Sequence, residues 1–250
     1  MSTASLTLLH TKYSLLETLR VPIAVIGTVV FPALALLFFV VPQRSVAGDE
    51  EFATQAVASM AVFSVMVGSL FSFGLGIAEN REKPWDPYLR TLPAPGIARV
   101  LAHVLSTGLM AIIALIPLVI IGALLTAARA TPLELLAGLL AIIVAGLPFM
   151  LLGICIGYAF STKAAIAVIQ IVFFTLAFAG GLFLPPVLFP DWLNAISQFL
   201  PSRQARDFVI WAVQGGTIEP LTWLGLVGWI VLLLAGALLL FRRDEGRRFR

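Results

Sequence analysis

The densest group of charged and aromatic side chains in this sequence lies in residues 79–99, between two long apolar runs. Side chains of these types suit protein docking rather than a chemical reaction. Prolines stand near both ends of a short segment in which Trp85, Leu89 and Leu92 would share one helical face. An aromatic and aliphatic face flanked by charges is typical of a docking surface for another protein. The alternative is that Trp85 and Tyr88 anchor the neighbouring helices at a membrane surface.

A second distinctive stretch carries four prolines between residues 185 and 201 and follows a long charge-free run. Pro185 and Pro186 cannot continue a helix, so we expect them to end the preceding one. Pro190 suits the first position of a new helix, whose apolar and polar residues fall on opposite faces. Its apolar face holds Phe189, Trp192, Leu193, Ile196, Phe199 and Leu200. A helix of about ten residues rises only about 15 Å, half of a bilayer core, so we expect it to lie in the membrane surface.

The residues that catalysis or ion coupling would require are missing from the apolar runs. No Asp, Glu, Lys or Arg stands in the middle of one, which argues against an ion-coupled carrier. His10 and His103 are far apart and Cys155 is the only cysteine, so the sequence offers no cluster of metal ligands. No lysine follows a glycine, so the Walker A loop that binds ATP is absent.

The composition indicates which elements must position these residues. The chain is 60% hydrophobic and 12% charged, against about 25% charged in a soluble domain, so it is an integral membrane protein. Six charge-free runs are each long enough for about 30 Å of helix. These runs are residues 22–41, 52–78, 100–128, 135–162, 164–184 and 220–241.

In front of these runs, residues 1–21 predict a cytoplasmic amphipathic helix that lies along the membrane interface. A disordered tail is the alternative. The apolar residues that recur at helical spacing are Leu6, Leu9, Tyr13 and Leu16. Residues 208–218, which end in two glycines, are interpreted as a short helix outside the six spans.

Lysine and arginine are distributed unevenly between the two sides of the predicted spans. With the N-terminus inside, twelve of the sixteen lie on the inner side. The four on the outer side are Arg44, Arg129, Arg203 and Arg206. Because cytoplasmic loops carry an excess of these residues, we expect a multi-pass protein of the cell membrane with both termini in the cytoplasm. The charged loop is then inside and the proline-rich stretch outside.

Taken together, these features resemble the type-2 ABC exporter permease family, whose six-span membrane subunits pair with a separate ATP-binding subunit. The likeness covers nearly the whole chain and is most specific at residues 180–185, 190–193 and 199–201. There the sequence is similar to the family's Gly-x-x-Phe-Pro, Pro-x-Trp-Leu and Leu-Pro segments. The charged loop resembles the family's coupling segment, which contacts the ATPase. It departs from the family at residues 83–86, where Lys-Pro-Trp-Asp replaces the frequent Gly-Thr-Leu-Glu.

The resemblance implies an all-α integral membrane fold with six transmembrane helices. An N-terminal interfacial helix at residues 1–21 would precede a permease domain at residues 22–250. That domain would contain a coupling loop at residues 79–99 and an external re-entrant helical hairpin at residues 185–219.

The function implied by the resemblance is export by a dimer of permease subunits. The cargo would be an amphipathic drug-, antibiotic- or lipid-like molecule, and a polysaccharide or lipid-linked glycan is the alternative. A partner ATPase would bind ATP and Mg²⁺, and this chain would hold no cofactor, no metal and no catalytic residue. A nucleic acid partner is not expected. Outside this family, a non-ABC carrier or a membrane enzyme stays open, although no acid, base and metal residues converge near one membrane face.

The expected site residues form three groups. The ATPase-coupling residues are Glu79, Arg81, Glu82, Trp85, Tyr88, Leu89, Leu92 and Pro93. The residues of an external gate are Pro185, Pro186, Phe189, Trp192, Ile196 and Phe199, unless this hairpin only seals the bundle against lipid. The path-lining candidates are Gln55, Ser59 and Gln170, for which hydrogen bonding between helices is the alternative.

Overall fold

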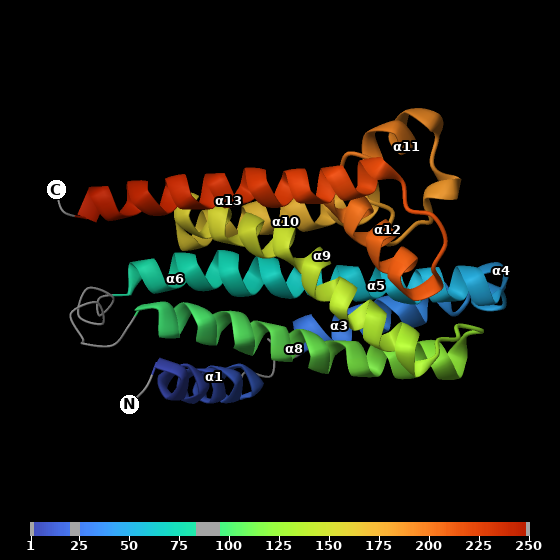
Figure 1. Ribbon diagram of the computed structural model, residues 1–250, viewed down its shortest axis with the longest axis horizontal. Coiled ribbons are helices and arrows are strands. Elements are labelled where there is room, and N and C mark those ends of the chain that lie inside the picture. Colours follow the sequence, from blue (N-terminus) through green and yellow to red (C-terminus); the bar gives the residue numbers. More distant parts are fainter. Residues whose placement is uncertain (1–2, 21–25, 84–95, 249–250) are drawn as a thin grey trace.

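The computed structural model describes residues 3–20, 26–83 and 96–248, and their side chains except those at 27–28, 96–100 and 245–248. Every regular element in these ranges is a helix. The helices form an elongated bundle (Figure 1), in which α1 (Thr3–Leu19) and the end of α13 (Pro220–Arg248) lie at the same end. We call this end the termini end and the opposite one the distal end.

Among the described residues, five helical stretches are long and apolar enough to cross a membrane, which confirms an all-α integral membrane fold. The first is a continuous rod of 33 residues made of α5 (Glu50–Ser69), the π-helix η3 (Leu70–Leu75) and α6 (Gly76–Glu82). The other four are α8 (Gly96–Leu125), α9 (Pro132–Ala159), α10 (Thr162–Ala179) and α13.

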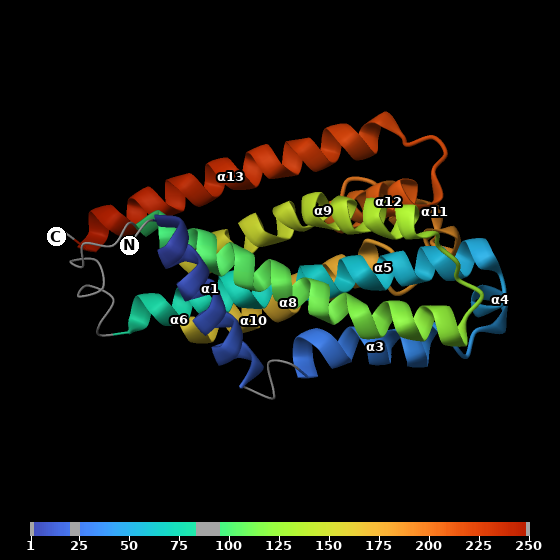
Figure 2. The same cartoon turned by 60° about the horizontal axis from the view of Figure 1, so that its bottom comes forward.

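The predicted first span at residues 22–41 is described only in part. Its described part is a shorter apolar stretch, made of η1 (Ile26–Val30), α3 (Phe31–Ala35) and η2 (Leu36–Val40). The short helix α4 (Arg44–Ala47) follows it at the distal end (Figure 2). Because α1 and the end of α13 lie at one end of the bundle, the chain must cross it an even number of times. Six crossings satisfy this condition, and the six-span topology itself stays a prediction.

Polar caps set where two of the long helices begin. At the start of α5, Asp49 Oδ1 accepts a hydrogen bond from the backbone N–H of Phe52 at 3.0 Å. At the start of α9, Thr131 and Glu134 form a reciprocal capping box, with donor–acceptor distances of 2.7 and 3.3 Å. Each cap pairs backbone donors that the first helical turn leaves without partners.

The rod lies at the centre of the bundle. Its side chains Phe63, Met66 and Leu70 are fully buried. Helix α9 crosses the rod so closely that glycine is required, because an added Cβ at Gly157 would lie 2.8 Å from the backbone oxygen of Gly74. Small residues allow helix backbones in membrane proteins to approach to such distances.

We expect Gly157→Ala to lower the free energy of unfolding by about 1–3 kcal/mol, because the new methyl group overlaps a backbone atom that cannot move aside. Gly228→Ala in α13 is the matched control, since an added Cβ there meets nothing within 4 Å. The thermal unfolding midpoints of the two purified variants measure the difference. Equal midpoints would contradict the close packing of α9 on the rod.

Helix α1 packs beside α8 with its small polar residues rather than its leucines. Thr7 and Thr11 are buried, and Ser14 Oγ lies 3.2 Å from Ser106 Oγ of α8. Figures 1 and 2 both show α1 beside the N-terminal half of α8. The exposed apolar residues of α1 are Leu8, Leu9, Tyr13, Leu16 and Leu19. The expected helix is therefore present with its apolar face open for lipid, and its place in the membrane interface stays a prediction.

The fifth predicted span, α10, ends earlier than expected. The prediction that the prolines at 185–186 end it is wrong, since the helix ends at Ala179. Gly181 has φ +76°, in the left-handed region that favours glycine, and it turns the chain back. At Gly180 the side chain of Ser202 leaves no room for a Cβ. The packing of the helix that begins at Pro201 over this point therefore sets the end of α10.

Three short helices complete the distal end: η4 (Pro186–Leu188), α11 (Asp191–Ser197) and α12 (Pro201–Gln214). The helix expected after Pro190 is α11. The interpretation of residues 208–218 as a separate short helix is wrong, because α12 begins at Pro201. Proline suits this first position, and Leu200 before it is extended with ψ 139°. That these helices form a re-entrant hairpin in a membrane stays a prediction.

Candidate functional site

One arginine at the termini end of the rod binds two neighbouring helices. Arg81 of α6 donates from Nη2 and Nε to Oδ1 of Asp244 in α13, at 2.6 and 3.0 Å. Its Nη1 donates to the backbone oxygen of Gly157 in α9 at 2.8 Å, and its guanidinium lies 5.7 Å from the centre of the Tyr158 ring. The Asp244 side chain is only 6% exposed, so Arg81 compensates a buried charge. Arg81 therefore joins the rod to α9 and α13.

The next residue, Glu82, joins the rod to α10. Its Oε1 accepts a hydrogen bond from the backbone N–H of Thr162 at 2.9 Å, and its Oε2 accepts one from the Thr162 hydroxyl at 2.7 Å. Thr162 is the first residue of α10, where free backbone N–H groups and the helix dipole favour a carboxylate. We call Arg81, Glu82, Thr162 and Asp244 the termini clamp. Its contacts tie the rod to the ends of three other candidate spans.

A second arginine-centred network lies at the distal end. Arg206 of α12 is 6% exposed and donates from Nε to Ser59 Oγ of the rod at 2.9 Å. Its Nη1 donates to Asp207 Oδ1, also at 2.9 Å. Burial lowers the pKa of the Arg206 guanidinium, and the Asp207 carboxylate partly opposes this. This contact fixes α12 against the rod.

Arg203 extends the network to the short helix α11. Its Nε donates to the second oxygen of Asp207 at 2.6 Å. Its Nη1 reaches Asn194 Oδ1 and Ser197 Oγ of α11, at 3.3 and 3.2 Å. We call these six residues the distal network: Ser59, Asn194, Ser197, Arg203, Arg206 and Asp207. It links the rod, α11 and α12.

A cavity of about 280 Å³ lies beside the distal network, lined by residues of α12, α13 and the rod that include Arg206 and Gln55. The path-lining candidates Gln55 and Ser59 lie one turn apart on the rod, where the Ser59 hydroxyl donates to the backbone oxygen of Gln55 at 2.7 Å. Ser59 is only 2% exposed, however, and its hydroxyl is bonded to Arg206. Gln170 lies elsewhere, on the exposed face of α10. Two of the three candidates therefore lie on one helix near the distal network, and the third lies on another helix.

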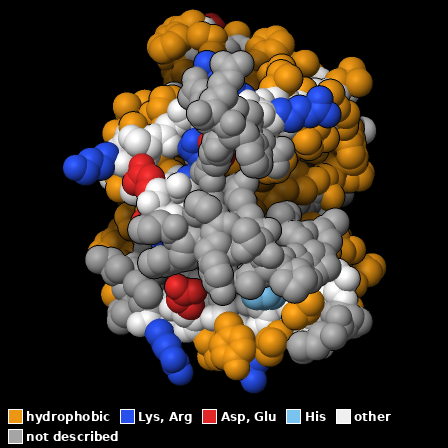
Figure 3. All heavy atoms as spheres, turned by 90° about the vertical axis from the view of Figure 1, so that its left-hand side faces the viewer, with side chains coloured by type: hydrophobic (Ala, Val, Ile, Leu, Met, Phe, Trp, Pro, Cys, Tyr) orange, Lys and Arg blue, Asp and Glu red, His pale blue; other side chains and the backbone are white. Residues whose placement is uncertain are grey.

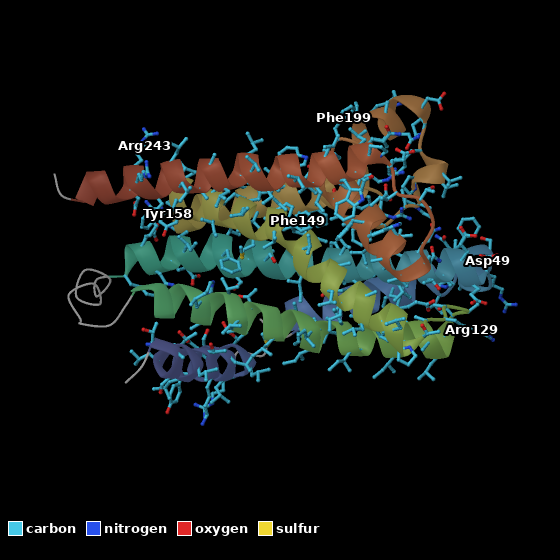
Figure 4. The ribbon with its side chains drawn as sticks, viewed as in Figure 1. Asp49, Arg129, Phe149, Tyr158, Phe199 and Arg243 are labelled. Atoms are coloured by element: carbon cyan, nitrogen blue, oxygen red, sulfur yellow. The ribbon has the colours of Figure 1, made fainter. Side chains whose placement is uncertain are left out.

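Three expected gate residues, two on α11 and one in the turn after it, face away from the protein. Trp192, Ile196 and Phe199 are 65%, 54% and 61% exposed, whereas Ser197 on the opposite face is fully buried. Figure 4 shows Phe199 at the edge of the bundle. Such a face requires lipid or another protein surface to cover it. The expected gate residues that are buried or half-buried are Pro185, Pro186 and Phe189.

Comparison with known proteins assigns these features to a family. Residues 41–240 match the family model described as "ABC-2 family transporter protein". The chain belongs to this family. It is also similar to the "Putative transport permease YvfS" of Bacillus subtilis (strain 168), with 25% identity over 237 residues, which are 95% of this chain and 93% of that protein. The chain is therefore an ABC-2 permease, a membrane subunit of an ABC transporter.

In this ABC-2 permease the expected coupling residues divide into two sets. Glu79, Arg81 and Glu82 lie in α6, where Glu79 is exposed and the other two belong to the termini clamp. The expected residues that lie outside the described part of the chain are Trp85, Tyr88, Leu89, Leu92 and Pro93. Sequence reasoning missed Asp244 and Thr162. A signal existed for Asp244, since it interrupts the basic run that follows the last apolar stretch.

The two ends of the ABC-2 permease also differ in their basic residues. Figure 3 faces the termini end and shows lysine and arginine side chains at the edge of this face. Figure 4 shows Arg243 at the termini end, and Arg129 with Asp49 at the distal end. The described basic residues in helices that end or begin at the termini end include Arg81, Lys163, Arg242 and Arg243. Residues that the charge bias assigns to one membrane side therefore share one end of the structure.

Proposed function

We propose that this permease is one half of an exporter, in which two membrane subunits enclose a path for an amphipathic drug-, antibiotic- or lipid-like molecule. A separate ABC ATPase subunit would bind ATP and Mg²⁺ and would contact residues 79–93. The observation that carries the proposal is the termini clamp. Its side chains, directly beside the expected coupling segment, are bonded to the ends of three other spans.

The rod explains how such a contact would act at a distance. Arg81 in the termini clamp and Ser59 in the distal network belong to one continuous helix. A push on the coupling segment would therefore tilt an element that also carries the distal contacts. The π-helix η3 lies between the two, and π-helical turns often occur at functional sites. ATP binding by the partner would in this way open and close the distal end.

The exposed face of α10 supports a second permease subunit. Ile166, Gln170 and Phe174 lie on this face, and all three are exposed. A glutamine facing lipid in mid-span would leave its amide without hydrogen-bond partners, which is costly. We therefore place this face at the interface between two subunits, where Gln170 borders the path. Charge-free spans around such a path suit an amphipathic cargo.

One observation favours the alternative cargo, a polysaccharide or lipid-linked glycan. Aromatic side chains are exposed on both the first apolar stretch and α10, and sugar rings pack well on aromatic faces. The side chains are Phe38, Phe39, Phe174 and Phe178, and each is exposed by at least 48%.

Transport into inverted membrane vesicles tests the direction and the energy source. Vesicles with the permease and its ABC ATPase should accumulate an amphipathic fluorescent dye when ATP is added, because export from the cell is uptake into such vesicles. The matched control carries an ATPase subunit with an inactive catalytic site. ATP-driven loss of preloaded dye would indicate import. Hydrolysis of ATP by the purified permease alone would contradict the assignment of ATP hydrolysis to a separate subunit. That assignment rests on the missing Walker A loop.

Cysteine labelling tests the orientation in the membrane. In a Cys155→Ala background, we expect Arg129→Cys and Thr217→Cys to react with an impermeant thiol reagent from outside intact cells. Glu79→Cys and Lys163→Cys should react only after the membrane is opened, because the charge bias places their end in the cytoplasm. All four positions are exposed, so burial does not hide them. The reverse labelling pattern would invert the topology and the proposed ATPase contact.

A further inference from the structure

The cavity beside the distal network has the lining of a ligand site. Its volume is about 280 Å³, and side chains of α12, of the turn before α13 and of the rod surround it. Arg203 and the deeply buried Arg206 both line it. The uncharged polar side chains around them are Gln55, Gln198, Thr217 and Thr222. A cavity with such polar walls suits the polar end of a small molecule.

The two guanidinium groups have hydrogen-bonding capacity left. Arg206 uses Nε for Ser59 and Nη1 for Asp207. Arg203 uses Nε for the same carboxylate and Nη1 for two residues of α11. Within the described part of the chain, the Nη2 atom of each arginine makes no hydrogen bond. Guanidinium N–H groups stay protonated and match the oxygen atoms of phosphates and carboxylates.

The charges around the cavity select a single anionic group. Arg203 and Arg206 share one carboxylate, that of Asp207, so these three side chains together carry one net positive charge, which the Glu219 carboxylate at the same cavity balances. Glu219 lines the same cavity from an exposed position and would repel further negative charge. A ligand with one phosphate or one carboxylate therefore fits better than a polyanion.

We propose that this cavity binds a single phosphate or carboxylate group on the polar end of an amphipathic molecule, with Nη2 of Arg203 and of Arg206 as donors. Ile210 and Trp211 also line the cavity and would cover the adjoining carbon atoms. The anionic group comes either from a membrane lipid or from a water-soluble molecule. The site lies within one subunit and requires neither ATP nor a second copy, so it does not depend on the proposed export.

Binding to the purified full-length chain tests the proposal. Native mass spectrometry compares phosphatidylglycerol with diacylglycerol, which lacks the phosphate, and calorimetry compares glycerol 3-phosphate with glycerol. We expect the phosphate-bearing probes to bind and Arg206→Gln to weaken that binding at least about tenfold, because a charge-assisted hydrogen bond is lost. Binding of glycerol 3-phosphate assigns a site for soluble molecules, and binding of phosphatidylglycerol alone assigns a lipid site. Binding of neither overturns the proposal.

A second variant keeps the test decisive if Arg206→Gln fails to fold. The Glu219 side chain is exposed and makes no hydrogen bond within the described residues, so Glu219→Gln should fold. It should bind the phosphate-bearing probe about two- to fivefold more tightly, because a repelling charge is removed. Arg129→Gln is the matched control, an exposed arginine at the same end but outside the cavity, and should bind as the unchanged chain does. Equal binding by Glu219→Gln and the unchanged chain would place the anion elsewhere and overturn the site.

Discussion

Arg81→Ala is expected to lower the free energy of unfolding of this ABC-2 permease by about 2–5 kcal/mol. The substitution removes two hydrogen bonds and one ion pair from Asp244, whose side chain is only 6% exposed, and breaking a buried ion pair in this way costs about this much. It also frees α6 from the backbone of α9. Chemical unfolding of the purified chain measures the loss. In the assembled transporter, we expect ATP hydrolysis that no longer responds to cargo, because the coupling segment has lost its link to α13.

Two further variants test whether the loss of stability comes from the ion pair between Arg81 and Asp244 or from removing any positive charge at this end. Arg243 stands beside Asp244 in sequence but is exposed, so Arg243→Ala should change stability by no more than about 0.5 kcal/mol. The double variant Arg81→Ala/Asp244→Ala should lose less than the sum of the two single variants, since it leaves neither charge without the other. Strict additivity in this cycle would show that the two side chains do not stabilise each other.

Ile196→Asp is expected to disturb the distal end without preventing assembly of the dimer. Ile196 is 54% exposed on the apolar face of α11. A carboxylate there costs about 2–3 kcal/mol if the side chain lies in hydrocarbon, and less close to the interface. If α11 gates the path, ATP-driven efflux per assembled dimer should fall and basal ATP hydrolysis should change. ATP-driven uptake of dye into inverted vesicles, normalised to the amount of dimer measured by cross-linking, measures this efflux.

Ala195→Asp is the matched control for this gate experiment. Ala195 is the neighbouring residue on α11 and is also exposed, but it lies one helical turn after Asp191, on the polar side. The new carboxylate meets water there, so efflux should stay close to that of the unchanged chain. Unchanged efflux in Ile196→Asp as well would leave α11 only the role of sealing the bundle against lipid.

The sequence by itself determined the fold class, the family and most of the span positions. Charge-free runs of at least 20 residues can only be buried in a bilayer or in protein, so the approximate positions of the spans follow from composition alone. The helix after Pro190 and the absence of a Walker A loop could also be inferred from the sequence alone. These features are local, because each depends on residues that are neighbours along the chain.

Only the tertiary structure decided which polar residues meet. Arg81 and Asp244 are 163 positions apart, and Arg206 and Ser59 are 147 apart, so no spacing rule connects them. The end of α10 could not be predicted from the sequence either, because it depends on the packing of Ser202 against Gly180 and not on the prolines that follow. The position of a membrane span is determined by the apolar character of its own residues. Polar contacts between spans depend instead on which helix faces meet after packing. Those faces are set by the packing of all the helices together.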